Sequence, residues 1–286
     1  MFFCDANIDI NKTEIEKLGA KILSVKYEIN GETFVYEDKR TFNYELFYTN
    51  LNQNKVKPVF LNPNFYVSTF EPYLKKGEDV CYIIESANIN LSYNYIKNAI
   101  EILQEKYPDR KIVLIDTLNA SCGYGEIVKN ALMVFNKNKD LDETIKFIKN
   151  FRRNVSTYFM LNNLSNLKKI ANLNGLFNLD AKIVSVKPVF CLDKKGKLSL
   201  ISKPIGVNKA VVELEQKIVE FGLNVNDHSV YVLHTNNELL AKKVKKDLIN
   251  ILGDEAQIVV KQVSPLYAIY CGEGAVGISF HSKIKN

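Results

Sequence analysis

A polar segment between an apolar run and a predicted helix carries more hydrogen-bonding side chains than a helix start requires. The apolar run VCYII covers residues 80–84, and ESANINLSYN covers residues 85–94. Capping of a helix start by Ser, Asn or Asp accounts for about one or two such side chains. The surplus predicts a binding role for this segment. Its polar side chains are Glu85, Ser86, Asn88, Asn90, Ser92 and Asn94.

Three other segments rich in small or polar residues follow apolar runs, at residues 5–7, 116–125 and 264–274. Ligands of open α/β sheets bind outside the carboxyl ends of the strands, and residues 5–7, 85–94 and 116–125 are expected to share that edge. Free N–H groups at helix starts, with serine hydroxyls, favour a carboxylate or a phosphate. With 16 Phe and 15 Tyr in the chain, the pattern predicts a site for an amphiphile with a small anionic head.

Side chains for nucleophilic or metal catalysis are sparse. The run NASCGYG comes nearest to G-x-S-x-G, but its Ser121 lacks the flanking glycines. His234 ends an apolar run and is interpreted as a structural histidine, and no metal-ligand spacing occurs. The run CGEGAVG contains G-x-G-x-x-G but opens no helix, so no dinucleotide site and no cofactor are predicted. We expect binding rather than turnover.

The composition indicates a cytoplasmic globular protein. The formal net charge is +6, from 38 basic and 32 acidic residues that are spread along the chain, so nucleic acid is not an expected partner. The dense run KKVKKD is interpreted as a solvated helix face. Five widely spaced cysteines fit free thiols in a reducing compartment. Neither a signal peptide nor a stretch long enough for stable membrane insertion is evident.

The elements that would position these segments form an α/β fold in two predicted domains. Residues 1–156 alternate continuous apolar strands with helices, which is typical of a parallel sheet covered on both faces. Within them, Asn30-Gly31 predicts a tight hairpin. Glycines at 123 and 125 are expected in a turn that leads into a helix. Residues 157–286 mix hairpins with crossover helices, which predicts an α+β two-layer domain.

The order of these motifs resembles the DegV family of bacterial fatty-acid-binding proteins, over essentially the whole chain. The resemblance implies an N-terminal α/β domain, a C-terminal α+β lipid-binding domain and one acyl chain held in the cleft between them. In some members a separate fatty-acid kinase phosphorylates the bound carboxylate. The matching runs are FFCDANIDI, YEINGETFVYED, IIESANINLSYNYIKNA, IVLIDTLNASCGYG, VKPVFCLDKKGKL, VYVLHTNNELLAKKVKKDL and SPLYAIYCGEGAVGISF.

The predicted head-group site departs from the family pattern at four places. The usual Thr-Ser-x-Pro is Phe60-Leu61-Asn62-Pro63, and Leu-Ser-Gly-Thr-Tyr is Leu91-Ser92-Tyr93-Asn94-Tyr95. The usual Gly-Arg-Ile is Ala171-Asn172-Leu173, and a histidine is Tyr270. A site without the arginine and the histidine should hold a carboxylate less tightly, because charge-assisted hydrogen bonds are about twice as strong as neutral ones.

The expected function is non-catalytic binding and carriage of a long-chain fatty acid or similar amphiphile. Ser92 and Tyr270 are predicted to contact the head group, assisted by Asn94, Ser86 and Asn62. A drifted site that binds another small molecule or only a protein partner is the alternative, and closure of the cavity by Phe60, Tyr93 and Tyr95 would favour it. An acyl- or phosphoryl-transfer enzyme acting through Ser92 or Ser121 ranks well below both.

Overall fold

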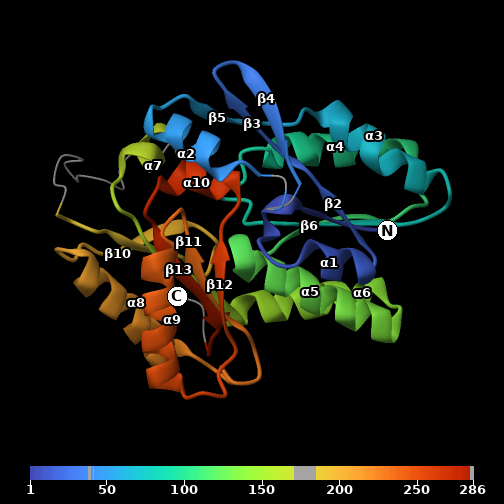
Figure 1. Cartoon of the computed structure of the whole chain (residues 1–286). Helices are drawn as coiled ribbons and strands as arrows, with labels where there is room; N and C mark the ends of the chain where they lie inside the picture. The colour runs from blue at the N-terminus through green and yellow to red at the C-terminus, as the bar shows by residue number, and fades with distance from the viewer. Residues whose placement is uncertain (38–39, 41, 171–184, 284–286) are drawn as a thin grey trace.

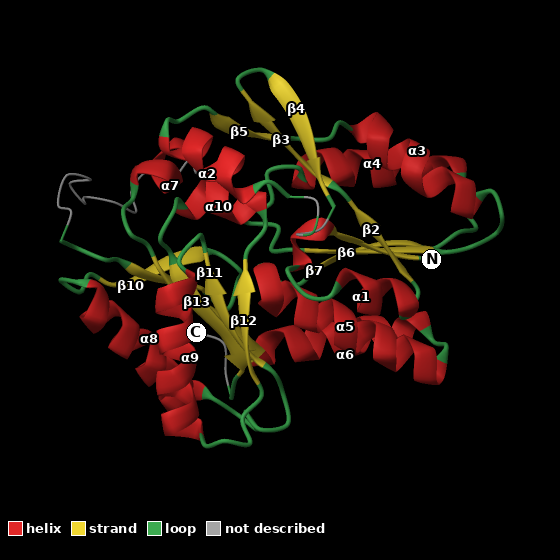
Figure 2. Ribbon diagram, in the orientation of Figure 1, coloured by secondary structure: helices red, strands yellow, loops and turns green. Residues whose placement is uncertain are grey.

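Two sheet-centred parts pack against each other in the computed structural model, which describes residues 1–37, 40, 42–170 and 185–283 (Figures 1 and 2). The first part is built on a four-stranded parallel sheet, and the second on a six-stranded mixed sheet. This arrangement confirms the predicted α/β architecture. The predicted boundary at 156/157 falls within strand β8 (Val155–Met160) of the six-stranded sheet and remains a prediction.

The parallel sheet has the order β2-β1-β6-β7 and is covered by helices on both faces (Figure 2). Strand β6 reads VCYII and is buried along its whole length, because α1, α5 and α6 lie against one face and α3 and α4 against the other. The bounds are β1 Phe2–Asp5, β2 Ala20–Leu23, β6 Val80–Ile84, β7 Ile112–Asp116, α1 Lys12–Lys17, α3 Pro63–Leu74, α4 Tyr93–Lys106, α5 Ser121–Asn138 and α6 Leu141–Phe151.

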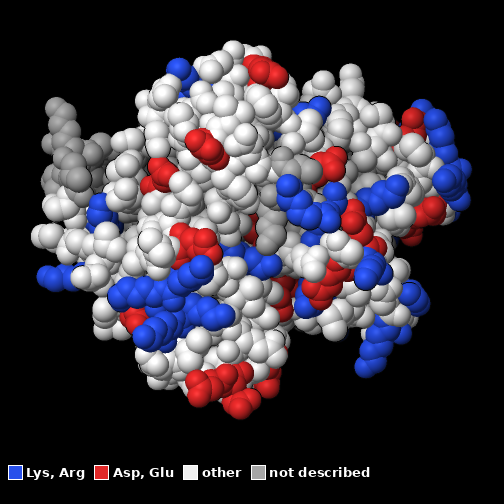
Figure 3. Space-filling view, in the orientation of Figure 1, with Lys and Arg blue, Asp and Glu red and all other residues white. Residues whose placement is uncertain are grey.

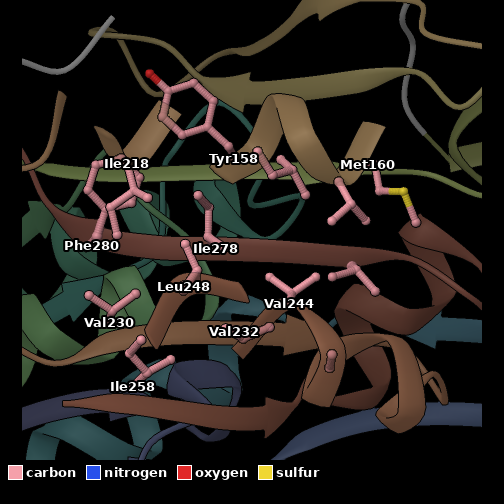
Figure 4. Packing of buried hydrophobic residues seen from close by; sticks show 14 of the residues in the cluster. Tyr158, Met160, Ile218, Val230, Val232, Val244, Leu248, Ile258, Ile278 and Phe280 are labelled. Atoms are coloured by element: carbon pink, nitrogen blue, oxygen red, sulfur yellow. The ribbon is translucent and has the colours of Figure 1, made fainter. Parts of the chain in front are cut away.

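The six-stranded sheet has the order β10-β9-β8-β13-β11-β12, with β11 and β12 parallel and the other neighbours antiparallel. Helices α8 and α9 cover one face, and Figure 4 shows Tyr158, Ile218 and Leu248 in the core between them. The bounds are β9 Val189–Leu192, β10 Leu198–Ser202, β11 Val230–His234, β12 Ile258–Gln262, β13 Val276–His281, α8 Val207–Phe221 and α9 Glu238–Leu252.

Strand alternation turns every second side chain of this sheet toward the first part. Tyr158 and Met160 of β8 face the helices, whereas Thr157 and Phe159 face away from them. A third sheet, of order β4-β3-β5, closes the space above this second face, together with α2 and α10. The bounds are β3 Val25–Ile29, β4 Glu32–Tyr36, β5 Val56–Val59, α2 Tyr44–Asn52, α7 Ser165–Ile170 and α10 Pro265–Cys271, with short 3-10 turns at η1 Ala6–Ile8 and η2 Arg152–Asn154.

Two glycine predictions have different outcomes. Asn30 and Gly31 join β3 to β4 with φ values of 52° and 89°, which confirms the predicted hairpin turn. Gly123 and Gly125 do not form a turn before a helix, because α5 already begins at Ser121. A Cβ on Gly125 would lie 2.4 Å from the Ile8 carbonyl oxygen, so the residue permits close packing of α5 on η1.

The surface carries mixed charges. Figure 3 shows Lys and Arg side chains gathered over α8 and α9 with acidic side chains beside them. On α9, Lys242 bonds Glu238 at 2.9 Å and Lys243 bonds Asp247 at 2.7 Å, as expected for a solvated helix face. Within the described ranges, no helix combines the length and apolar character needed to cross a bilayer.

Candidate functional site

Three loops meet at the carboxyl edge of the parallel sheet, as predicted. The Asn7 side-chain amide after β1 donates to Glu85 Oε2 after β6, at 3.1 Å. The backbone N–H of Ser86 donates to the Asn119 carbonyl after β7, at 2.7 Å. Side chains 78 residues apart in sequence thus share one edge of the sheet.

The fourth polar segment reaches the same edge from the second part. The Asp9 carboxyl accepts from the Ser121 hydroxyl at 2.5 Å and from the backbone N–H of Ser264 at 2.8 Å. Burial raises the pKa of Asp9 to about 8, and the hydrogen bonds from Ser121 and Ser264 limit the rise. Asp9 therefore ties the starts of α5 and α10 together, although Ser264 lies 255 residues further along the chain.

An apolar cavity lies between the two parts. It encloses about 670 Å³ of space free of atoms, including its open mouth. The first part contributes Ile89 and Ala120, and the second contributes the sheet face that turns away from α8 and α9. Polar groups at its wall include Thr157 and Ser121. The apolar wall consists mainly of Ile89, Ala120, Phe159, Leu167, Leu192, Leu198, Leu233, Val263, Ala275 and Val276.

A smaller polar cavity adjoins the apolar one and encloses about 470 Å³ of space free of atoms, its mouth included. Tyr270 lines both cavities. The Tyr267 hydroxyl, from the wall of the apolar cavity, donates to Glu85 Oε2 in the wall of the polar one, at 2.5 Å. The two cavities therefore meet at α10. The polar cavity is lined by Asp5, Asn7, Ser24, Val25, Lys26, Val59, Phe60, Leu61, Tyr66, Tyr82, Glu85, Asn90, Leu91, Ser92, Leu266 and Tyr270.

Buried carboxyl groups dominate the electrostatics of the polar cavity. Burial raises the pKa of Asp5 to about 7, despite a hydrogen bond from the Tyr82 hydroxyl. Burial, with a smaller contribution from the nearby carboxyls of Asp5 and Asp9, raises the pKa of Glu85 to about 8, although the hydrogen bond from Tyr267 opposes the rise. Near neutral pH Glu85 is therefore largely protonated, and Asp5 is protonated in a substantial fraction of molecules.

Three of the predicted site residues line the polar cavity. Ser92 lies just before α4 and lines the polar cavity. Burial raises the pKa of Tyr66, and a hydrogen bond with the Ser92 hydroxyl lowers it in part. Tyr270 is half-buried, and burial also raises its pKa. Phe60 lies at the wall with 39% of its surface exposed. Contact of any of the three with a ligand remains a prediction.

The other three predicted residues lie elsewhere. Ser86 is buried, and its hydroxyl donates to the Gly196 carbonyl in the β9–β10 turn at 2.7 Å. Asn62 is exposed and caps α3 by accepting from the Phe65 N–H at 3.0 Å. Asn94 is exposed on α4 and lies outside the described walls of both cavities. Some polar side chains that were predicted to contact a ligand thus have other roles. Asn62 caps a helix, and Ser86 joins the two parts of the structure. The altered triplet at 171–173 lies outside the described residues.

Sequence reasoning did not identify Asp5, Asn7, Glu85 or Ile89 as wall residues of the site. Their signal was present, because residues 5–7 and 85–94 were both chosen as candidate loops. His234 was interpreted as structural. It is buried, its Nδ1 accepts from the Asn237 N–H at 3.2 Å, and it lines the apolar cavity. It also lines a wider polar cleft beside that cavity, together with Lys12 and Lys261.

Comparisons with known proteins agree with this architecture. A family model described as "Uncharacterised protein, DegV family" matches residues 3–283. The DegV domain-containing protein CPE0304 of Clostridium perfringens is 27% identical over 285 residues, which cover 96% of this chain and 96% of that protein.

Solved structures are similar in fold. A crystal structure of a DegV family protein from Ruminococcus gnavus with vaccenic acid has a TM-score of 0.82 at 19% identity, and covers 97% of this chain and 98% of that chain. The Streptococcus pneumoniae Fatty Acid Kinase (Fak) B3 protein, loaded with linoleic acid, has a TM-score of 0.79 at 18% identity and covers 98% of each chain. These likenesses confirm the predicted fold. Because the family model spans nearly the whole sequence, this chain belongs to the DegV family.

Proposed function

We propose that this protein binds and carries a long-chain fatty acid or a similar amphiphile without catalysing a reaction on it. The observation that carries the proposal is the pair of adjoining cavities, one apolar and one polar, that meet at Tyr270. An acyl tail would occupy the apolar cavity and the head group the polar one. Family proteins described with bound vaccenic acid or linoleic acid support this assignment.

The sequence changes in the head-group segment do not fill the polar cavity, which favours a protein that still binds a ligand over one that has lost the site. Tyr93 and Tyr95 were candidates to close the cavity, but neither is among its described wall residues, and Tyr95 is 46% exposed on α4. Phe60 is at the wall, yet an open cavity remains beside it. The space for a head group therefore persists.

A carrier role fits the side chains at the site better than an enzymatic role. The Ser121 hydroxyl donates to Asp9, whose other carboxyl oxygen accepts from the Ser264 N–H, so this pair is explained by the contact between α5 and α10. A fatty-acid kinase is the partner that we infer, because one similar structure is named as a protein of such a kinase. We also infer a reducing, cytoplasmic setting, since all five cysteines are free.

The test is recovery of an acyl ligand and its dependence on the apolar cavity. Native mass spectrometry of the purified protein, followed by organic extraction, should reveal a bound long-chain species. Leu198→Trp places a large ring in the apolar cavity and should reduce binding of a fluorescent fatty acid at least tenfold. Leu239→Trp is the matched control, because Leu239 is 86% exposed on α9 and lies outside the described walls of both cavities.

Two results would contradict the proposal. One is purified protein that carries no acyl species and binds none after delipidation. The other is equal loss of binding in the Leu198→Trp and Leu239→Trp variants, both folded by circular dichroism, because the effect would then not come from the cavity.

A further inference from the structure

The polar cavity presents an acceptor that has no donor. Asn7 is 1% exposed and lines this cavity, and its side-chain oxygen has no hydrogen-bond partner within the described part of the chain. A buried acceptor without a donor is unfavourable, so the site is incomplete until a donor arrives.

The Asn7 amide nitrogen is turned toward Glu85, which leaves the amide oxygen facing the cavity. The amide nitrogen of Asn7 and the hydroxyl of Tyr267 both donate to Glu85 Oε2. With both groups donating to Oε2, a proton on this carboxyl sits on Oε1. In this arrangement the Asn7 oxygen is available to a ligand.

Two hydroxyl groups of the cavity already have partners. The Tyr82 hydroxyl is used by Asp5 Oδ1, and the Ser92 hydroxyl is bonded to Tyr66. Among the described wall residues Lys26 on β3 is the one basic side chain. An anionic head group would thus enter a cavity with two buried carboxyls and a single lysine.

The charged side chains near Glu85 belong to several elements, and most of them are acidic. Asp5, Asp9 and Asp116 each raise its pKa, and burial contributes more than any of them. The titratable hydroxyls nearby belong to five tyrosines, namely Tyr66 of α3, Tyr82 of β6, Tyr124 of α5, and Tyr267 and Tyr270 of α10. Lys26 completes the set.

We propose that the polar cavity takes a fatty acid only together with a proton, and that it favours an uncharged head group that donates a hydrogen bond. This inference rests on the proposed function, since it concerns the head group of the same ligand. Below about pH 8 the step is carboxylate plus protein protonated at Glu85, giving a complex in which the ligand acid and Glu85 share that one proton. Above about pH 8, where Glu85 has lost its proton, the complex takes the one proton from solvent. A long-chain alcohol meets the same requirement without taking up a proton, because its hydroxyl can donate to Asn7.

Calorimetric titration of delipidated protein with dodecanoic acid and 1-dodecanol, from about pH 6 to about pH 9.5, tests the proposal. The affinity for the acid should be flat below about pH 8 and then fall about tenfold per pH unit, whereas the affinity for the alcohol should stay flat. Glu85→Gln keeps an acceptor for Asn7 and Tyr267 and should remove most of the fall for the acid. Lys26→Met should weaken acid binding by no more than about threefold, whereas an ion pair with an anionic head predicts at least about tenfold.

The outcomes separate this inference from the proposed function. Acid affinity that is independent of pH, or a tenfold loss in Lys26→Met, overturns the inference while carriage of the acid stands. Failure of both ligands to bind at any pH overturns the proposed function and the inference with it. Near-ultraviolet circular dichroism of the tyrosines confirms that each variant retains its fold.

Discussion

Replacing Asp9 with asparagine should flatten the dependence of stability on pH. Asp9 Oδ1 accepts from the Ser264 N–H, and Oδ2 contacts the Ser121 hydroxyl. A protonated Asp9 can keep both contacts by donating from Oδ2 to the serine oxygen. Asparagine reproduces that neutral arrangement, because its NH₂ group takes the place of the protonated oxygen and its carbonyl still accepts from Ser264.

The sign of the effect follows from the raised pKa. The pKa of Asp9 is about 8 in the folded chain, against about 3.9 in an unfolded one. The folded state therefore binds the proton more tightly, so this contribution to stability is fully present below about pH 4 and is lost as the pH rises through about 8. Each pH unit between these limits costs about 1.4 kcal/mol, so the loss between about pH 5 and pH 7 is at most about 3 kcal/mol.

Urea unfolding at a series of pH values measures this loss. The free energy of unfolding of the unmodified protein should fall as the pH rises from about 5 to about 8, and Asp9→Asn should show a slope smaller by up to about 1.4 kcal/mol per pH unit. Asp109→Asn, at an exposed position between α4 and β7, is the control. A slope that is identical in the Asp9→Asn variant, or stability of the unmodified protein that rises over this range, would refute the reasoning.

Three further changes test other parts of the structure. Gly125→Ala should lower the free energy of unfolding by about 2 kcal/mol in urea titration, because the added methyl group meets the backbone of η1; full stability would contradict the close approach at Ile8. Asn62→Ala should cost about 1 kcal/mol by loss of the α3 cap, with fatty-acid affinity unchanged in a fluorescence titration; a large loss of affinity would instead make Asn62 a ligand group. Extending a bound fatty acid from twelve to sixteen carbons should tighten binding by up to about 3 kcal/mol in calorimetry, since each buried CH₂ contributes about 0.8 kcal/mol, and equal affinities would place the tail outside the apolar cavity.

Much of the fold was predictable because its signals are local. The run VCYII is apolar along its whole length, as a strand covered on both faces requires, and Asn30-Gly31 allows the backbone angles of a tight hairpin. The convergence of three loops follows from the parallel sheet itself, since the carboxyl ends of parallel strands share one edge.

The site was less predictable because its contacts join distant residues. Nothing local to Ser86 indicates that its hydroxyl bonds Gly196, 110 residues away, rather than facing a ligand. The capping role of Asn62 is local and was open to prediction, but a polar side chain before a helix suits a cap and a ligand equally. The acidic character of the polar cavity depends on the partly buried Asp5 and the buried Glu85 lining one cavity, which only the tertiary structure reveals.

The position of β13 has a consequence for synthesis of the chain. This strand pairs with β8 on one side and β11 on the other, although it follows both in sequence. The six-stranded sheet therefore stays split, with the inner edges of β8 and β11 unpaired, until the ribosome has delivered residue 281. The parallel sheet needs nothing beyond Asp116 for its strands and can assemble first. A nascent chain stalled between these points would present open strand edges, which makes it a candidate for chaperone binding.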